Sequence, residues 1–294
     1  MAKKSGKKAG RKSGIKLGLN LFLWSGQTNE ALFPVLDKVK KWGFDGVELP
    51  LFHTDEAVYQ RVRAKLDDLG LGCTGCTVSL PDKNPISDSD IVRQAGIQNL
   101  KDMLRMCHVL GAEVLCGPLV YPLGALVGRG RTQEEWQRAV QALTELGPYA
   151  EEMGVTVALE YLNRFETYFI NTAADLKALI MEVNHPRIRL MFDTFHANIE
   201  EKSTYKAAKS CGKHLAHVHI SENDRGVPGS GHVAWKEAFK ALREIKYKGW
   251  LTIESFGQTV PEIAAAAAIW RPLFKDNDEV AKKGIKFMKG MLAR

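Results

Sequence analysis

The strongest constraint on the fold is an alternation of short apolar segments with amphipathic helical segments, repeated eight times along the chain. The segments with strand-like composition are 15–23, 46–51, 72–79, 113–119, 156–162, 188–195, 215–221 and 250–255. Between them, apolar residues recur at helical spacing, as in the set Leu32, Val35, Leu36 and Val39. Such alternation implies parallel strands joined by crossover helices. Eight units in 294 residues predict an α/β fold that closes as a (β/α)8 TIM barrel.

A doubly wound open sheet is the alternative architecture for such a pattern. That fold usually carries a glycine-rich phosphate-binding turn after its first strand. The corresponding segment here, LNLFLWSGQT at 19–28, lacks the G-x-G-x-x-G pattern, and the chain contains no P-loop sequence. The barrel is therefore the favoured interpretation.

The basic charge of the chain is concentrated at its N-terminus. Residues 1–14, MAKKSGKKAGRKSG, contain six Lys and Arg residues and no acid, and removing these six charges from the net charge of +7 leaves +1 for residues 15–294. We expect a disordered basic tail, with a polyanion-binding arm as the alternative, followed by a single (β/α)8 barrel domain over 15–294. A near-neutral body gives no support for nucleic-acid binding. No apolar run has the length needed to cross a membrane.

The five cysteines indicate a reducing environment. Their odd number and their apolar surroundings predict free thiols and a cytoplasmic location. Cys73 and Cys76 have the spacing of a C-x-x-C metal or redox motif. They fall in a predicted strand, however, where residues three apart point to opposite faces, so we expect no metal shared between them.

Four successive strand segments in the second half of the chain each end in a metal-ligating residue type, namely Glu160, Asp193, His219 and Glu254. A carboxylate in an apolar strand is costly to desolvate unless something compensates it, and a metal ion is a common compensation. The carboxyl ends of neighbouring barrel strands meet at one face, where barrel active sites lie. Two Glu, one Asp and one His form an oxygen-rich set that suits Mn²⁺ or Mg²⁺, with Co²⁺ tolerated.

Taken singly, each of these residues is weak evidence, because a lone histidine in a strand is more often a satisfied core residue. His217 illustrates the point, since it shares a face with His219 but lies one pleat deeper. We assign His217 to the structure. Glu48, in GVELP at 46–50, is a further strand acid without an evident partner, and it is also assigned a structural role.

Longer motifs surround these residues: LEYLNRFE at 159–166, DTFHANIEE at 193–201, HVHISENDRG at 217–226, WLTIESF at 250–256 and IWRPLFKDNDE at 269–279. With these motifs the sequence resembles the ketose 3-epimerases of the xylose-isomerase-like barrel superfamily, the group of D-tagatose 3-epimerase and D-allulose (D-psicose) 3-epimerase. The resemblance extends from about residue 15 to the C-terminus.

For the strand-end residues, the resemblance implies a divalent metal, Mn²⁺ before Mg²⁺ or Co²⁺, held by Glu160, Asp193, His219 and Glu254. It also implies that Glu160 and Glu254 transfer a proton on opposite faces of substrate C3, through a cis-enediolate. Inversion by deprotonation requires two acid–base groups or one mobile group. The implied substrate is a free ketohexose or ketopentose, of the D-tagatose/D-sorbose, D-fructose/D-allulose or L-ribulose type.

The resemblance further implies that Glu166, His196 and Arg225 hold the substrate at O1 and O2. Positions expected at the other end of the sugar vary in the family and leave the preferred ketose open: Asn20, Trp24, Cys76 and the loop near Tyr121. A homodimer or homotetramer is also implied by the family.

Three other functions remain as alternatives on the same barrel. An aldose–ketose isomerase, like the hydroxypyruvate or rhamnose isomerases, would deliver the proton to C1 or C2. A nuclease like endonuclease IV would need several zinc ions and more histidine ligands than this chain offers. A sugar-binding protein without catalysis would not need the opposed pair Glu160 and Glu254.

Overall fold

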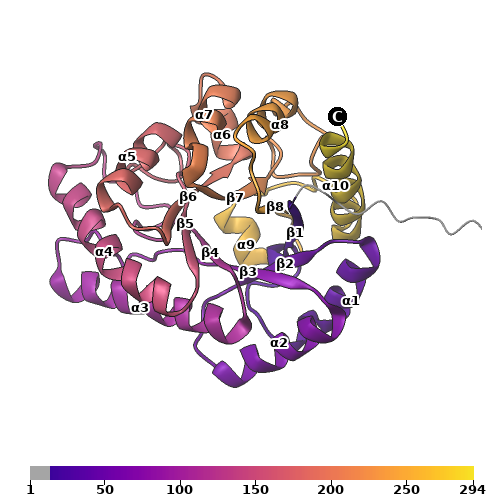
Figure 1. The fold of residues 1–294 in the computed structure, drawn as a ribbon, viewed down its shortest axis with the longest axis horizontal. Helices are drawn as coiled ribbons and strands as arrows, with labels where there is room; N and C mark the ends of the chain where they lie inside the picture. The colour runs from indigo at the N-terminus through magenta and orange to yellow at the C-terminus, as the bar shows by residue number, and fades with distance from the viewer. Residues whose placement is uncertain (1–13) are drawn as a thin grey trace, which may run out of the picture.

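Eight parallel strands form a closed barrel in the computed structural model, which describes residues 14–294 (Figure 1). The strands are β1 (Lys16–Asn20), β2 (Gly46–Pro50), β3 (Gly72–Cys76), β4 (Val114–Gly117), β5 (Thr156–Leu159), β6 (Ile188–Asp193), β7 (Leu215–Ile220) and β8 (Trp250–Ile253). Each strand pairs with the next in sequence, and β1 closes the ring by pairing with β8. The prediction of a (β/α)8 barrel is confirmed.

Helices surround the barrel, as Figure 1 shows. They are α1 (Phe33–Trp42), α2 (Glu56–Leu69), α3 (Asp90–Leu110), α4 (Gln133–Glu152), α5 (Ala173–Val183), α6 (Thr194–Glu200), α7 (Thr204–Cys211), α8 (Trp235–Glu244), α9 (Pro261–Ala266) and α10 (Asn277–Leu292). Helices α1, α2 and α3 each end at a glycine in the left-handed region, the usual helix C-terminal signal: Gly43, Gly70 and Gly111. The short α9 lies within the ring of strands in this view, whereas α10 packs outside β1 and β8.

Several strands are shorter at their carboxyl ends than the sequence predicted. The fifth strand was expected over 156–162 but ends at Leu159, and the third was expected over 72–79 but ends at Cys76. The chain remains hydrogen-bonded to the neighbouring strand for one residue more, because the Glu160 N–H donates to the Gly117 carbonyl at 3.0 Å. Glu160 therefore stands just beyond the end of its strand, where the backbone turns into a loop.

The prediction of free thiols agrees with the structure of residues 14–294. All five cysteines are free and buried. Cys73 packs with the core between barrel and helices, whereas Cys76 belongs to the separate cluster inside the barrel, so the two thiols face opposite sides of β3. In the described part of the chain, every helix is too short or too polar to cross a membrane. Disorder was predicted for residues 1–14, of which residues 1–13 lie outside the described residues.

The interior of the barrel is unusually polar for this fold, whose centre is normally filled by branched apolar side chains. Asn20, Glu48 and Thr74 occupy adjacent register positions on β1, β2 and β3, and each is at most 1% exposed. His219 and Thr252 are register partners on β7 and β8, and β8 adjoins β1 in the closed ring. Buried polar groups must be paired to be tolerated, so this interior indicates a site built on the strands.

Candidate metal centre and active site

The four residues predicted as metal ligands converge at the carboxyl end of the barrel. Glu160, Asp193, His219 and Glu254 are all buried, and each offers one ligand atom such that these atoms lie within 4.8 Å of one another. His219 Nδ1 is 3.2 Å from Glu254 Oε1, 3.5 Å from Asp193 Oδ2 and 3.9 Å from Glu160 Oε1. The structure therefore brings this predicted set together around one point.

Strand register and a helix cap fix these side chains. Asp193 is the last residue of β6 and aligns with His219 on β7, so both side chains point to the same end of the interior. Asp193 Oδ1 also caps α6 by accepting the backbone N–H groups of Phe195 at 2.5 Å and His196 at 3.2 Å. With Oδ1 engaged in this way, Oδ2 is the atom left to face the cluster.

Two buried atoms of the cluster have no hydrogen-bond partner among the described residues. These atoms are His219 Nδ1 and Glu160 Oε1. Arg225 is the one Lys or Arg that the structure places on the cluster within these residues, with Nη1 2.6 Å from Glu254 Oε2 and 3.3 Å from Asp193 Oδ2. Three carboxyl groups and one imidazole thus gather around a single guanidinium in a buried space. A divalent cation that accepts oxygen and imidazole ligands fits this donor set.

The pKa values of the two facing carboxyl groups are shifted in opposite directions. Burial raises the pKa of Glu160 well above its ordinary value, and the adjacent Glu254 carboxylate raises it further. Burial also opposes ionisation of Glu254, but the charges of His219 and Arg225 outweigh it and lower the Glu254 pKa to about 2. Burial disfavours protonated His219, yet the carboxylates of Glu254 and Glu48 outweigh burial and raise its pKa. A cation bound among these groups would favour their deprotonated forms.

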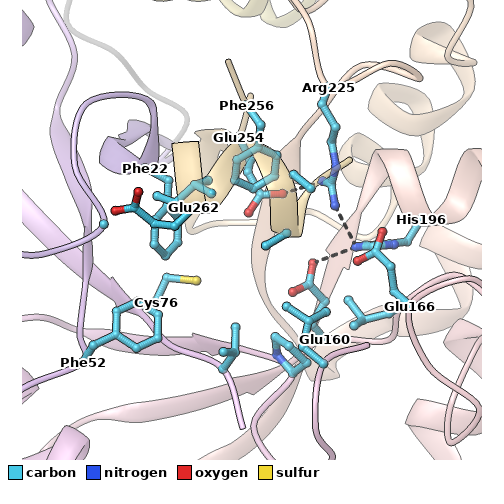
Figure 2. Close-up of a pocket in the computed structure, with 18 of the residues that line it drawn as sticks. Phe22, Phe52, Cys76, Glu160, Glu166, His196, Arg225, Glu254, Phe256 and Glu262 are labelled. Carbon is cyan, nitrogen blue, oxygen red and sulfur yellow. Dashed lines mark hydrogen bonds and ion pairs between the residues drawn. The ribbon is translucent and has the colours of Figure 1, made fainter. Parts of the chain in front are cut away.

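A cavity of about 360 Å³ opens beside the cluster (Figure 2). This volume is within the range of small-molecule sites, ~300–1,000 Å³. One wall is polar and is formed by Glu160, Glu166, His196, Arg225 and Glu254. The opposite wall is largely apolar and is formed by Phe22, Phe52, Cys76 and residues of α9, while Glu262 also lies on this side of the cavity. Phe256 lies beside Arg225 and Glu254. The site therefore offers hydrogen-bonding groups at one end and apolar contact at the other.

His196 presents a neutral N–H group to the cavity. The backbone N–H of Asn163 donates to His196 Nδ1 at 3.0 Å, so the ring proton is on Nε2. That nitrogen lies 3.7 Å from Glu160 Oε1 and 3.2 Å from Arg225 Nη2. Burial, and then the charge of Arg225, lower the pKa of His196 to about 3. The imidazole is thus a fixed hydrogen-bond donor on the polar wall.

Arg225 and Glu166 flank His196. The Arg225 guanidinium lies 3.8 Å from the centre of the Phe195 ring and 5.0 Å from that of Phe256, and Ser221 Oγ is 3.1 Å from its Nη1. Arg225 adopts a left-handed backbone with φ of 64°, which is uncommon for a residue with a side chain. Glu166 accepts a hydrogen bond from the Asn163 side chain at 2.7 Å, and burial raises its pKa. Glu166, His196 and Arg225 therefore share one wall of the cavity.

Glu222 is a buried acid that the sequence analysis did not identify. Its carboxylate accepts the backbone N–H groups of Gly229 at 2.7 Å and Val233 at 3.2 Å, and the indole N–H of Trp235 at 3.1 Å. These bonds fix the loop between β7 and α8, which carries Arg225. Its only signal in the sequence is an acid placed at the start of a glycine-rich loop.

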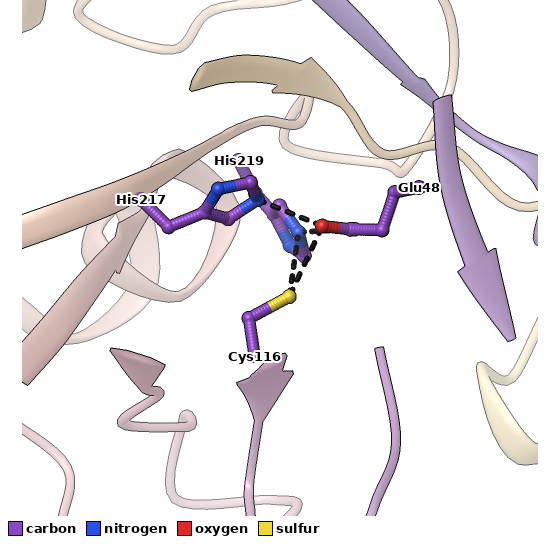
Figure 3. A group of neighbouring side chains, drawn as sticks. All are labelled: Glu48, Cys116, His217 and His219. Carbon is purple, nitrogen blue, oxygen red and sulfur yellow. Dashed lines mark hydrogen bonds and ion pairs between the residues drawn. The ribbon is translucent and has the colours of Figure 1, made fainter. Parts of the chain in front are cut away.

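Glu48 is the second acid whose role was missed. The sequence showed no partner for it, but in the structure it lies beneath the candidate metal centre and contacts His219 and His217, with Oε1 2.7 Å from His219 Nε2 and Oε2 2.8 Å from His217 Nε2 (Figure 3). Its environment is fully buried. The contact joins β2 to β7 across the barrel interior.

Comparison with known proteins places the chain in a family. Residues 36–291 match the profile of the family described as xylose isomerase-like TIM barrel. The chain belongs to the xylose isomerase-like TIM barrel family. This match covers strands β2 to β8, including all four residues of the candidate metal centre.

Members of this family with similar sequences carry epimerase names. The chain is 34% identical over 270 residues to the protein named "Probable ketose 3-epimerase" of Synechocystis sp., which covers 91% of this chain and 93% of that protein. It is 30% identical over 279 residues to D-psicose 3-epimerase of Agrobacterium fabrum, which covers 92% of this chain and 96% of that protein. These relatives confirm the resemblance to the ketose 3-epimerases inferred from the motifs.

A solved structure of this family has the same fold over nearly the whole chain. The D-allulose 3-epimerase of Methylomonas sp. in complex with D-allulose superimposes with a TM-score of 0.89 at 29% identity, covering 94% of this chain and 97% of that chain. The comparison confirms the barrel architecture and its chain order.

Proposed function

We propose that this chain is a metal-dependent ketose 3-epimerase that inverts C3 of a free ketohexose or ketopentose. The observation that carries the proposal is the pair of buried carboxyl groups, Glu160 and Glu254, which face one cavity beside a single cluster of metal-ligating atoms (Figure 2). The epimerase names of its relatives support an isomerase that acts on the C3 centre of ketoses.

The metal would be held by Glu160, Asp193, His219 and Glu254, with Mn²⁺ favoured and Mg²⁺ or Co²⁺ as alternatives. When bound, a divalent ion of this kind supplies Lewis-acid stabilisation of negative charge on the substrate oxygens. The oxygen-rich donor set and the two unpaired buried atoms of the cluster support this assignment.

The substrate would bind with its ketone end on the polar wall. The Nε2–H group of His196 and the guanidinium of Arg225 both donate, so they orient and stabilise the carbonyl oxygen as it gains negative charge. Glu166 accepts a hydrogen bond from a hydroxyl group at the same end. Arg225 is held by Glu254 and by two aromatic rings, so its position is fixed before the substrate arrives.

Inversion at C3 follows from two carboxyl groups acting in turn. The C3 hydrogen next to the ketone is weakly acidic, and its removal gives a planar cis-enediolate. One of Glu160 and Glu254 takes this proton, and the other returns a proton to the opposite face. The direction depends on which epimer is bound, because each epimer presents its hydrogen to a different carboxyl group.

The lining of the cavity favours a free sugar over a sugar phosphate. Arg225 is the only Lys or Arg among the described residues that line it, and Glu254 and Asp193 already pair with this guanidinium. At the other end of the cavity a phosphate would meet Phe22, Phe52 and Glu262 instead of a cation. An uncharged ketose therefore suits this site better.

Solvent labelling tests the reaction. A panel of ketoses, including D-fructose, D-allulose, D-tagatose and L-ribulose, is incubated with the enzyme and Mn²⁺ in D₂O and analysed by chromatography and NMR. We expect deuterium at C3 of the product, none at C1, and no aldose. Glu160→Gln and Glu254→Gln should each abolish turnover, because an amide does not serve as a base. Glu152→Gln, at an exposed position of α4, should leave turnover unchanged.

The same experiment separates the alternative function. An aldose–ketose isomerase on this barrel would place deuterium at C1 or C2 and accumulate an aldose, and that result would replace the proposed activity. Epimerisation with no solvent label after prolonged incubation would instead exclude two independently exchanging carboxyl groups. Sedimentation of the same sample tests the proposed homodimer or homotetramer.

A further inference from the structure

Glu48, Cys116, His217 and His219 form a second buried cluster, and the proposed reaction gives a role only to His219 (Figure 3). We propose that Glu48 is a positioning residue for the metal centre: its carboxylate accepts the Nε2–H group of His219 and so directs the Nδ1 lone pair of that ring at the metal. This inference rests on the metal centre of the proposed function, with His219 as a ligand.

The geometry of His219 carries the inference. Its Nε2 atom is 2.7 Å from Glu48 Oε1, and both side chains are fully buried. An ionised carboxylate only accepts hydrogen bonds, so the proton between these atoms belongs to Nε2. The opposite nitrogen, Nδ1, is the one that faces Glu254, Asp193 and Glu160. Glu48 therefore selects the tautomer that leaves Nδ1 free to bind a cation.

Glu48 is itself fixed from both sides. The side-chain N–H group of Asn20 donates to Oε1 at 2.9 Å, and the hydroxyl group of Thr74 donates to Oε2 at 2.8 Å. Asn20 and Thr74 are the register neighbours of Glu48 on β1 and β3. Three adjacent strands thus hold one carboxylate in a single orientation, as a residue that orients a ligand requires.

The cluster is better described as a supporting network than as a second metal site. A carboxylate has about four lone-pair positions. In Glu48 these positions receive donors from Asn20, His219, Thr74 and the Cys116 thiol, whose Sγ is 3.1 Å from Oε2, and His217 Nε2 lies 2.8 Å from the same oxygen. A second cation bound to Glu48 would have to displace several of these donors from a fully buried interior.

The expected effect follows from loss of the negative charge behind the ligand. Glu48→Gln keeps the size of the side chain and an oxygen that can accept from His219, but it removes the charge. Loss of such an outer partner typically weakens metal affinity ~10–100-fold. We therefore expect Mn²⁺ to bind Glu48→Gln 10- to 100-fold more weakly than wild type. At saturating Mn²⁺, kcat should fall while KM for the ketose stays within about threefold, because Glu48 does not line the cavity.

Mn²⁺ affinity is measured by titration with detection of free Mn²⁺ by electron paramagnetic resonance, and the metal content per chain is measured in parallel. Thr252→Val is the matched control. Thr252 is also fully buried in the barrel interior, is the register partner of His219, and its hydroxyl makes no hydrogen bond within residues 14–294. The Mn²⁺ affinity of Thr252→Val should remain within about twofold of wild type. A general packing defect would instead weaken Mn²⁺ binding in both variants alike.

A second measurement uses the wild-type chain and does not depend on the folding of a variant. In protein labelled with ¹⁵N-histidine and loaded with diamagnetic Mg²⁺, the ring that responds to metal addition should carry its proton on Nε2 and none on Nδ1. The opposite tautomer would overturn the inference. So would wild-type affinity for Mn²⁺ in folded Glu48→Gln.

The remaining outcomes separate this inference from the proposed function. Two metal ions per wild-type chain, with one lost in Glu48→Gln, would overturn the supporting role in favour of a second metal site. Failure of the wild-type chain to bind a divalent metal would also overturn it. If the wild-type chain binds Mn²⁺ with the expected tautomer but epimerises no ketose, the proposed function fails and the role of Glu48 stands.

Discussion

Replacing Arg225 by methionine tests how the candidate site balances its charge. The side chain of Arg225 packs against the rings of Phe195 and Phe256, and its Nη1 contacts Glu254 at 2.6 Å and Asp193 at 3.3 Å. Methionine has a similar length and fills the space beside these rings, but it carries no charge. The variant therefore removes the guanidinium that pairs with both buried carboxylates.

The expected magnitudes follow from burial. Breaking a buried ion pair by removing one partner costs ~3–5 kcal/mol, and Arg225 is only 6% exposed. At about 2 °C per kcal/mol for a chain of this size, the melting temperature should fall by about 6–10 °C in EDTA. A bound divalent ion compensates the same carboxylates, so the fall should be clearly smaller in Mn²⁺. Loss of a donor to the developing oxyanion should lower kcat/KM at least ~100-fold, which equals about 2.7 kcal/mol.

The assay compares melting temperatures in EDTA and in Mn²⁺, together with kcat/KM on the best ketose of the panel. Arg271→Met is the matched control, because the Arg271 side chain is 70% exposed and its distance to Asp224 is 3.8 Å. Equal losses of melting temperature with and without metal would refute the idea that cation and guanidinium share the same carboxylates. A fall in kcat/KM below threefold would remove Arg225 from substrate binding.

Two further predictions concern the metal and the loop after β7. EDTA should abolish turnover, and Mn²⁺ or Co²⁺ should restore it. Added Mn²⁺ should no longer raise the melting temperature of the His219→Ala variant. Full activity of metal-stripped enzyme would exclude the metal-dependent mechanism. Glu222→Gln weakens the charged acceptor of three N–H groups, so it should lose about 1–3 kcal/mol of stability and lower kcat/KM by misplacing Arg225. An unchanged kcat/KM would show that Arg225 is positioned without this loop.

Local sequence patterns were sufficient for the architecture. Helical spacing in one segment and continuous apolar runs in the next depend only on neighbouring residues, and their eight-fold repetition determines the barrel. The residues at which the strands end were predicted less accurately from these patterns. The run 156–162 stays apolar beyond Leu159, but the backbone leaves the ladder there, because the strands of a barrel separate where loops begin. The amino-acid composition of this run therefore does not indicate where the strand ends.

The candidate metal centre was predictable because each of its residues marks the carboxyl end of a strand, and barrel topology brings such ends together. The role of Glu48 was not predictable by the same logic. It lies 171 residues from His219 in sequence, and the two meet only across the closed interior. Which interior side chains touch depends on the stagger of opposite strands, and periodicity within one strand does not encode it. Glu222 was missed for a similar reason, since its partners are backbone groups of a loop.

Closure of the ring by β1 and β8 also sets the order in which the metal centre is assembled during synthesis. Glu160, Asp193 and His219 leave the ribosome before Glu254, which follows the last strand. A nascent chain therefore carries three of the four candidate ligand residues on unclosed strands, and the fourth joins them only when β8 docks between β7 and β1. The complete candidate metal centre is thus a property of the closed ring.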